Sequence, residues 1–152
     1  IKKISTTSHP AHGQNGLFTK RKYIGNELIV PYIGIIHAAL TSANIDSMTE
    51  EVRDEHTDSD YDISLLRISA SDPSNPFPGQ HVSIGVDAAT AGNAGRFVND
   101  FRGIASAPNA EFRLGKGGTG ELRMEIWSLK QGIPKGEEVL VSYGKGWWGA
   151  RR

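Results

Sequence analysis

Short polar side chains alternate with glycines over residues 86–110, where the chain has its greatest potential for chemistry. Asn99, Asp100 and Asn109 can each bond nearby backbone and hold an irregular loop, and Gly92 allows conformations that other residues avoid. Such a loop is costly to bury unless its polar groups find partners. The residues alone leave two interpretations open: a well-ordered loop, or a loop whose amide groups face a polar ligand.

Two further patterns are those of metal ligands. His9 and His12 stand three residues apart, but Pro10 disfavours a helix and no third ligand stands near, so we expect a solvent-exposed pair. Residues 58–69 begin like a calcium loop but lack its central glycine and its final glutamate. The chain has no cysteine, which excludes disulfides and thiolate ligands. We therefore expect no metal site.

A glycine-rich segment, residues 115–120, reads GKGGTG and matches the GxGxxG pattern of dinucleotide-binding loops. Such a loop needs a helix directly after it, because the helix N-terminus binds the pyrophosphate. Residues 122–129 instead show the alternating apolar positions that are typical of a strand. We expect a flexible hairpin turn here rather than a phosphate site.

The elements that must position these groups are mostly short strands. Strand-like runs cover residues 28–34, 61–68, 111–114, 122–129 and 138–142. Eighteen glycines and little helical pattern predict a mainly β (α+β) domain. One short helix is expected in the polar segment 38–59, beginning at Asp46 or Ser47 and running through Glu55.

The composition limits the class of protein. A chain of 152 residues makes one domain, and its 17 basic and 17 acidic residues cancel. We therefore expect no direct binding to nucleic acid, and the lack of a long apolar run argues against the membrane. The absence of cysteine fits an intracellular protein. Because the chain begins at Ile1 rather than methionine, we expect it to be an excised fragment.

Two ordered motifs resemble the signature of SET-domain protein-lysine methyltransferases. Residues 86–100 contain Asp-Ala, Gly-Asn and Arg-Phe-x-Asn, with Pro-Asn following at 108–109. Residues 136–144 read Gly-Glu-Glu-Val-Leu-Val-Ser-Tyr-Gly. The N-terminal half adds Gly-Leu-Phe at 16–18 and Tyr-x-Gly at 32–34. The resemblance covers nearly the whole chain.

This resemblance implies a single SET domain over residues 1–152, with a β-clip type fold of several small sheets. Its C-terminal segment would be threaded beneath the loop at 99–109, a pseudoknot that is an exception to the rule against threaded connections. A variable insert at about 38–80 would form one wall of the substrate groove. Residues 144–152 would form the tryptophan-containing tail at the C-terminal end of this domain.

The resemblance further implies methyl transfer from S-adenosylmethionine to a lysine side chain of a protein or peptide. A histone tail is the commonest target of the family, which would place the protein on chromatin, in the nucleus or the cytoplasm. Tyr143 matches the catalytic tyrosine, whose hydroxyl would orient the amine. Tyr32 matches the tyrosine that often lines the lysine channel. The alternative for either is a buried tyrosine with a satisfied hydroxyl.

Five positions match residues that bind the cofactor in the family. Gly16 and Phe18 would offer backbone groups to its amino-acid end, which Asn99 would bind through its side chain. Asp100 stands where the family usually has histidine, at a position that recognises the adenine edge largely through its backbone. Tyr61 matches an aromatic residue that packs near the cofactor.

The tail carries Trp147 and Trp148 side by side, flanked by glycines. Such a pair does not suit an independent core, so we expect it to fold back, as packing or as a lid over a planar ligand. Within the resemblance, either tryptophan would stack on adenine.

Arg96 is expected to order its loop through a charged pair. The alternative function is a SET fold that has lost catalysis and binds peptides.

Overall fold

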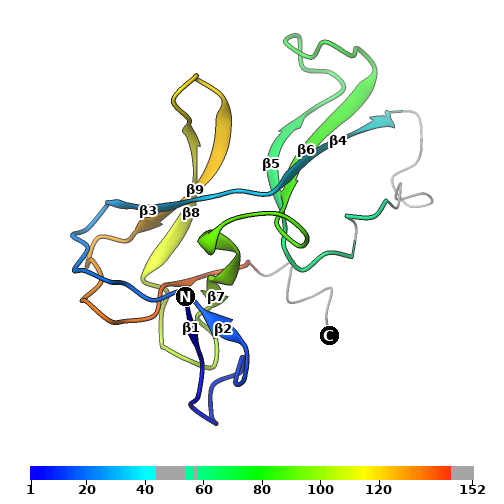
Figure 1. Ribbon diagram of the computed structural model, residues 1–152. Helices are drawn as coiled ribbons and strands as arrows, with labels where there is room; N and C mark the ends of the chain where they lie inside the picture. Colours follow the sequence, from blue (N-terminus) through cyan, green and yellow to red (C-terminus); the bar gives the residue numbers. More distant parts are fainter. Residues whose placement is uncertain (44–53, 57, 145–152) are drawn as a thin grey trace.

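The computed structural model describes residues 1–43, 54–56 and 58–144, and these ranges are built almost entirely from strands (Figure 1). Their only helix is η1, a single 3-10 turn at Ala94–Phe97. The mainly β prediction is therefore confirmed, while most of the helix expected at 46–55 lies outside the described residues. Nowhere in the described ranges is a helix long and apolar enough to cross a bilayer.

The strands form four small sheets (Figure 1). The strands are β1 (Lys2–Lys3), β2 (Asn15–Gly16), β3 (Leu28–Tyr32), β4 (Ile35–Ser42), β5 (Asp62–Ile68), β6 (Gln80–Asp87), β7 (Asn99–Asp100), β8 (Ala110–Lys116), β9 (Leu122–Ser128) and β10 (Leu140–Val141). Two sheets have three strands, in the orders β3-β9-β8 and β4-β6-β5. The other two are the pairs β1-β2 and β7-β10.

The β3-β9-β8 sheet is antiparallel and contains the glycine-rich segment as a hairpin turn. Residues 117–121 connect β8 to β9, and Gly120 has a φ of +83°, which a glycine adopts without steric cost. The prediction of a hairpin in place of a dinucleotide loop is thus confirmed. Ile126 at the centre of β9 is fully buried, and it pairs with Val30 and Phe112 on the two neighbouring strands.

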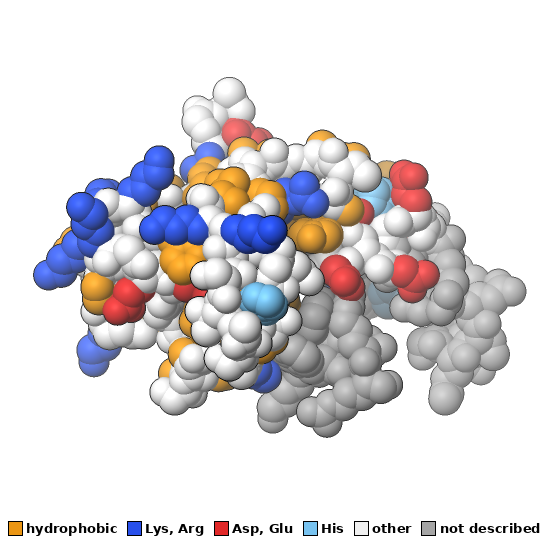
Figure 2. All heavy atoms as spheres, turned by 60° about the horizontal axis from the view of Figure 1, so that its bottom comes forward, with side chains coloured by type: hydrophobic (Ala, Val, Ile, Leu, Met, Phe, Trp, Pro, Cys, Tyr) orange, Lys and Arg blue, Asp and Glu red, His pale blue; other side chains and the backbone are white. Residues whose placement is uncertain are grey.

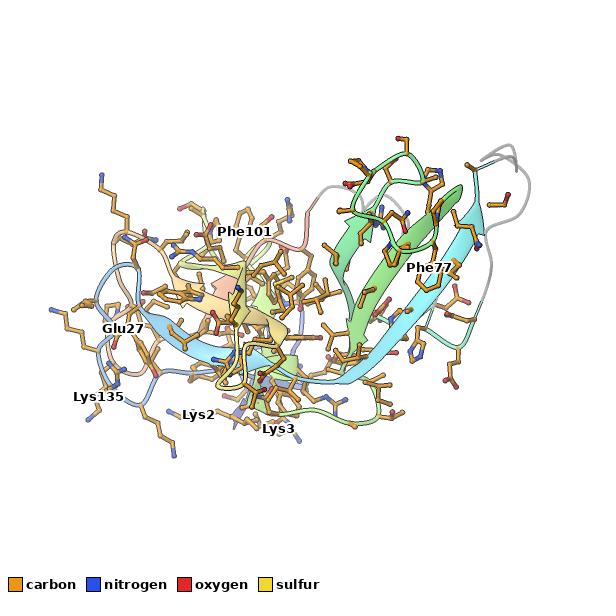
Figure 3. All side chains as sticks on the ribbon, turned by 90° about the horizontal axis from the view of Figure 1, so that it is seen from above. Lys2, Lys3, Glu27, Phe77, Phe101 and Lys135 are labelled. Atoms are coloured by element: carbon orange, nitrogen blue, oxygen red, sulfur yellow. The ribbon has the colours of Figure 1, made fainter. Side chains whose placement is uncertain are left out.

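The β4-β6-β5 sheet departs from the sequence prediction. Residues 38–42 were expected to begin a polar, partly helical insert, but they belong to β4, and β6 was not anticipated. The reason lies in the pairing. Strand β4 pairs with β6 along its full length, and this pairing holds its small residues in a strand. Figure 3 shows this sheet projecting from the rest of the molecule, with Phe77 beside it.

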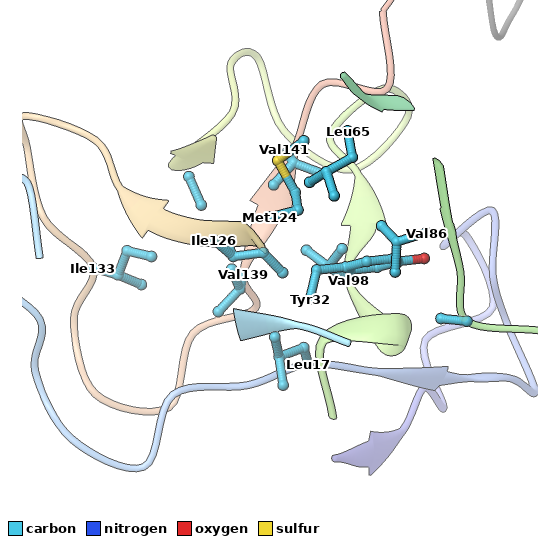
Figure 4. Close-up of a cluster of buried hydrophobic side chains, with 12 residues drawn as sticks. Leu17, Tyr32, Leu65, Val86, Val98, Met124, Ile126, Ile133, Val139 and Val141 are labelled. Atoms are coloured by element: carbon cyan, nitrogen blue, oxygen red, sulfur yellow. The ribbon is translucent and has the colours of Figure 1, made fainter. Parts of the chain in front are cut away.

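The core lies where the sheets meet (Figure 4). Its buried members are Leu17, Tyr32, Leu65, Val86, Ala88, Val98, Ala110, Met124, Ile126, Ile133, Val139 and Val141. Full burial of one large aliphatic side chain contributes about 1.5–3 kcal/mol. Because the members come from six of the ten strands and from the loops beside them, the core fixes the ends of β3, β6 and β10 relative to one another.

The C-terminal strand has the arrangement expected of the pseudoknot. Strand β10 pairs in parallel with β7, with Leu140 opposite Asn99. Asn109 holds Leu140 from the other side, because its backbone amide donates to the Leu140 carbonyl at 3.0 Å and its Oδ1 accepts from the Leu140 amide at 2.8 Å. The side-chain nitrogen of Asn109 also donates to the Glu138 carbonyl at 2.8 Å. Residues 138–141 therefore lie between two parts of one loop.

Candidate functional site

A cavity of about 870 Å³ lies where the two three-stranded sheets approach the β7-β10 pair. Its lining residues are Gln14, Asn15, Tyr32, residues 60–64, Arg67, residues 96–99, Phe112 and Tyr143. Four of the residues expected at the site, Tyr32, Tyr61, Asn99 and Tyr143, therefore line one cavity. They come from four separate segments of the chain.

Tyr143 is held at both ends. Its backbone amide donates to Asp100 Oδ2 at 2.7 Å, and its hydroxyl donates to the Val98 carbonyl at 2.5 Å. Burial raises the pKa of Tyr143, and the nearby Asp100 carboxylate adds to the effect, so the phenol stays protonated at neutral pH. A phenol that donates its proton to a carbonyl acts towards other groups as an acceptor.

Tyr32, the last residue of β3, is similarly fixed. It is buried, and its hydroxyl donates to the Tyr61 carbonyl at 2.7 Å. Its ring meets Phe112 edge-on, with 5.8 Å between ring centroids. Burial raises the pKa of Tyr32 as well, so this phenol is also neutral at physiological pH. Its hydroxyl is satisfied and its side chain lines the cavity, so the structural and functional interpretations both stay open.

Asn99 belongs to a buried network that the sequence did not reveal. Its Nδ2 donates to Glu138 Oε1 at 2.9 Å, and Glu138 Oε2 lies 2.8 Å from His9 Nε2. The prediction that His9 is exposed is wrong: only 8% of its side chain is accessible, whereas His12 is exposed. Consecutive turns and the β1-β2 pair fold residues 4–14 back against Glu138, which accounts for the difference.

Gly16 and Phe18 lie outside the lining of the large cavity. Gly16 is buried in β2, and a Cβ added there would come within 2.7 Å of Glu138 Oε1. Phe18 forms an isolated backbone bridge with Glu138, and its ring lines a second cavity of about 370 Å³. Lys2 Nζ lies 5.6 Å from the centre of that ring. Cofactor contacts by Gly16 and Phe18 thus stay a prediction about their backbone groups.

Asp100 is buried in β7 and its carboxylate braces its surroundings. Besides the Tyr143 amide, it accepts from the Arg102 backbone at 2.9 Å and from Arg102 Nη1 at 2.8 Å. The Asp100 side chain is therefore engaged in hydrogen bonds to the loop and to Tyr143, so the predicted adenine contact would be made by the Asp100 backbone. Trp147 and Trp148 lie outside the described residues, and their predicted role stays a prediction.

Arg96 orders its loop by a different means from the one expected. Among the described residues it forms no ion pair; its Nη2 donates to the Ala89 carbonyl at 3.0 Å. Its guanidinium lies 4.8 Å from the centre of the Tyr61 ring and 5.2 Å from that of Phe97. These aromatic faces take the place of a carboxylate partner. Its buried Nε has no hydrogen-bond partner in the described part of the chain.

A histidine pair beside the cavity has no signal in the sequence. The rings of His37 and His56 stack with 4.1 Å between centroids, and each has its own carboxylate. His37 Nε2 lies 2.6 Å from Asp62 Oδ1, and His56 Nδ1 lies 2.7 Å from Asp87 Oδ2. The hydrogen bond to Asp87 raises the pKa of His56. Burial alone would raise the pKa of Asp87, but its hydrogen bonds from His56, Ala89 and Ser59 outweigh burial and lower it.

No group of three or more histidine, aspartate or glutamate side chains in the described ranges has the arrangement of a metal site. In the histidine pair each imidazole is engaged with carboxylates: His37 with Asp62, and His56 with Asp87 and, at 3.5 Å, with Glu55. The side chains that line the large cavity include phenols, amides, carboxylates, the guanidinium groups of Arg67 and Arg96, and aromatic rings.

Comparison with known proteins identifies the fold. The family model described as SET domain matches residues 14–144. Among solved structures, "ctPRC2 in an autoinhibited conformation bound to S-adenosylmethionine" is similar, with 22% sequence identity and a TM-score of 0.53. The match covers 85% of this chain and 13% of that one, so the chain corresponds to a small part of its neighbour. No curated protein matches.

Proposed function

Because this chain belongs to the SET-domain family, we propose that it is an S-adenosylmethionine-dependent protein-lysine N-methyltransferase. SET domains use S-adenosylmethionine to methylate lysine. The observation that carries the proposal is the convergence of Tyr32, Asn99 and Tyr143 on one cavity. These residues lie in different motifs of the family signature, so their meeting at one place supports a working site.

The cavity suits this cofactor chemically. A ligand with a sulfonium, an ammonium and an adenine ring calls for acceptors and aromatic faces, and the lining offers Asn99, Asp60 and Tyr61. Asn99 would hold the amino-acid end, with backbone groups of Gly16 and Phe18 nearby.

The remaining contacts concern the adenine ring. The backbone of Asp100 would meet its edge, and Trp147 or Trp148 would stack on its face. Tyr61, which already stacks with Arg96, would pack against the cofactor from within the cavity.

When bound, the cofactor supplies an electrophilic methyl group on its sulfonium sulfur. Tyr143 and Tyr32 hold their phenol oxygens in place through the Val98 and Tyr61 carbonyls, and so present fixed acceptors to the N–H groups of a lysine amine. The rings of Tyr32, Phe112 and Tyr143, which line the cavity, would shield the amine from water, which would lower the lysine pKa and favour the neutral amine. Alignment, rather than proton abstraction by a phenolate, is thus the role we assign to Tyr143.

The substrate we propose is a lysine-containing protein segment, such as a histone tail. A histone substrate would place the protein on chromatin in the nucleus, and another protein substrate would allow a place in the cytoplasm. Figure 2 shows most lysine and arginine side chains on the left of the molecule, while acidic side chains lie mainly on the right, with a few at the left and at the top. Asp60 and Asp62 line the cavity itself, together with Arg67 and Arg96. A basic peptide would therefore be drawn to the acidic side. Direct nucleic-acid binding is not expected from a net charge of zero.

The proposal is tested by calorimetry with S-adenosylmethionine and by methyl transfer to histone and lysine-rich peptides. We expect heat of binding and incorporation of methyl groups on lysine. A chain that binds peptide but shows neither heat nor thermal shift with the cofactor would instead be a catalytically inactive SET-fold binding module.

A further inference from the structure

We propose that His9 is a positioning residue for the amino-acid end of the cofactor, acting through Glu138 on the side chain of Asn99. This inference rests on the proposed function. It starts from a buried chain of contacts that links the N-terminal turns, the segment before β10 and strand β7. Only 8% of the His9 side chain and 10% of the Glu138 side chain are accessible.

The contacts of His9 decide where its ring carries the proton. His9 Nδ1 accepts a hydrogen bond from the Ala11 backbone amide at 3.0 Å, so this nitrogen has no proton of its own. The proton of the neutral imidazole is therefore on Nε2, which donates to Glu138 Oε2 at 2.8 Å. The turn at residues 9–11 thus converts a histidine into a fixed donor aimed at a carboxylate.

Glu138 in turn decides the orientation of the Asn99 amide. A carboxylate only accepts hydrogen bonds, so the amide must present its nitrogen to Glu138 Oε1, at 2.9 Å, and turn its oxygen away. Asn99 lines the large cavity, where an oxygen acceptor suits an ammonium group and a nitrogen donor would repel it. The carboxylate therefore selects the rotamer of Asn99 that can bind the amino-acid end.

Burial makes this arrangement depend on His9. A carboxylate taken out of water is costly unless hydrogen bonds replace the lost hydration. Glu138 receives one such bond from His9 and one from Asn99, and the missing side chain of Gly16 leaves room for it. Without the His9 donor, Glu138 would turn towards water and release its hold on Asn99.

The test compares His9→Leu, which keeps most of the side-chain volume, with His9→Gln, which restores an N–H donor. His12→Leu is the matched control, since His12 is exposed three residues away. The ligands are S-adenosylhomocysteine and 5′-methylthioadenosine, which lacks the amino-acid end, and calorimetry gives both dissociation constants. We expect His9→Leu to weaken S-adenosylhomocysteine about tenfold and to leave 5′-methylthioadenosine unchanged. His9→Gln should recover most of the affinity.

A double-mutant cycle then asks whether His9 acts through Asn99. In an Asn99→Ala background, His9→Leu should have no further effect on S-adenosylhomocysteine binding. Equal weakening of both ligands, additive effects in the cycle or no effect of His9→Leu would each overturn the inference while leaving the proposed function standing. A wild-type chain that binds neither ligand would overturn the proposed function itself. Melting temperatures of all variants show whether each is folded.

Discussion

Asp100 Oδ2 accepts a hydrogen bond of 2.7 Å from the backbone amide of Tyr143. A buried carboxylate in β7 thus fixes the backbone two residues after the end of the paired strand β10. The Tyr143 hydroxyl returns to the Val98 carbonyl, two residues before Asp100. The same short segment therefore holds both ends of the proposed catalytic tyrosine.

Replacing Tyr143 by phenylalanine should separate catalysis from binding. We expect turnover to fall by roughly two to three orders of magnitude, because one fixed polar group at the reacting centre is lost. Cofactor affinity should barely change, while the Val98 carbonyl loses a partner and stability falls by about 1–3 kcal/mol. Methyl transfer to the peptide panel and thermal melts measure both. Tyr23→Phe is the control. The Tyr23 ring contacts Arg21 and does not line the large cavity, so this variant should retain activity.

Removing the Asp100 carboxylate should disturb Tyr143 without touching its ring. Asp100→Ala leaves the Tyr143 amide without its acceptor, so we expect a loss of about 1–3 kcal/mol in unfolding free energy and a marked loss of turnover. Arg102→Gln removes the ion pair to Asp100 together with the guanidinium contact to the Phe101 ring and, being partly exposed, should cost about 1 kcal/mol or less. If the two variants behaved alike, the ion pair rather than the Tyr143 contact would be the important one.

Gly85 leaves room for the bridge between His37 and Asp62. A Cβ at Gly85 would come within 2.6 Å of His37 Nε2 and 3.0 Å of Asp62 Oδ1. Gly85→Ala should therefore break that pair and lower the free energy of unfolding by about 1–3 kcal/mol, measured in urea. Gly118→Ala, in open space within the hairpin turn, is the matched control. An unchanged free energy of unfolding for Gly85→Ala would show that the sheet can shift to accommodate the added methyl group.

The His56–Asp87 pair predicts a pH dependence of stability. The pKa of His56 is raised above its ordinary 6.5, so its contribution is complete below pH 6.5 and is lost as the pH rises through the raised value. The pKa of Asp87 is lowered below 3.8, so its contribution is complete above that pH and is lost in stronger acid. The difference in melting temperature between wild type and His56→Gln should thus be largest from pH 3.8 to 6.5. Asp87→Asn should remove this dependence; an unchanged profile would contradict the pairing.

Deleting residues 146–152 tests the two tryptophans of the tail. If Trp147 or Trp148 covers adenine, the truncated chain should bind S-adenosylmethionine more weakly and melt at nearly the same temperature. Single replacements by leucine then identify which of the two contributes. Loss of the fold would assign the pair to packing, and unchanged affinity would remove the tail from the site.

The sequence predicted those parts of the molecule whose signal is local. The family resemblance rests on short motifs that contain Asn99 and Tyr143, and both residues line the large cavity, while the β8-β9 hairpin follows from residue types within a few positions. Strand β4 did not, because Ala38 and Ala39 suit a strand only once β6 lies beside them. Intrinsic preference was overridden there by pairing with a distant segment.

The hydrogen-bond networks escaped prediction for a similar reason. His9 and Glu138 are 129 positions apart, and no pattern in either segment indicates the other. His37 and His56 likewise stack because Asp62 on β5 and Asp87 on β6 hold their rings. These histidines have structural contacts because the fold buries them at least partly, and burial depends on the whole fold rather than on the local sequence.

The placement of β10 between β7 and Asn109 also sets an order on folding. Strand β10 can dock only after some forty intervening residues have been made, and its contacts carry a large loop-closure entropy. The large cavity is incomplete without Tyr143, so its last wall forms in one of the final folding events. During synthesis, the chain should therefore gain affinity for its ligand abruptly, once its C-terminal segment is available, rather than gradually as it lengthens.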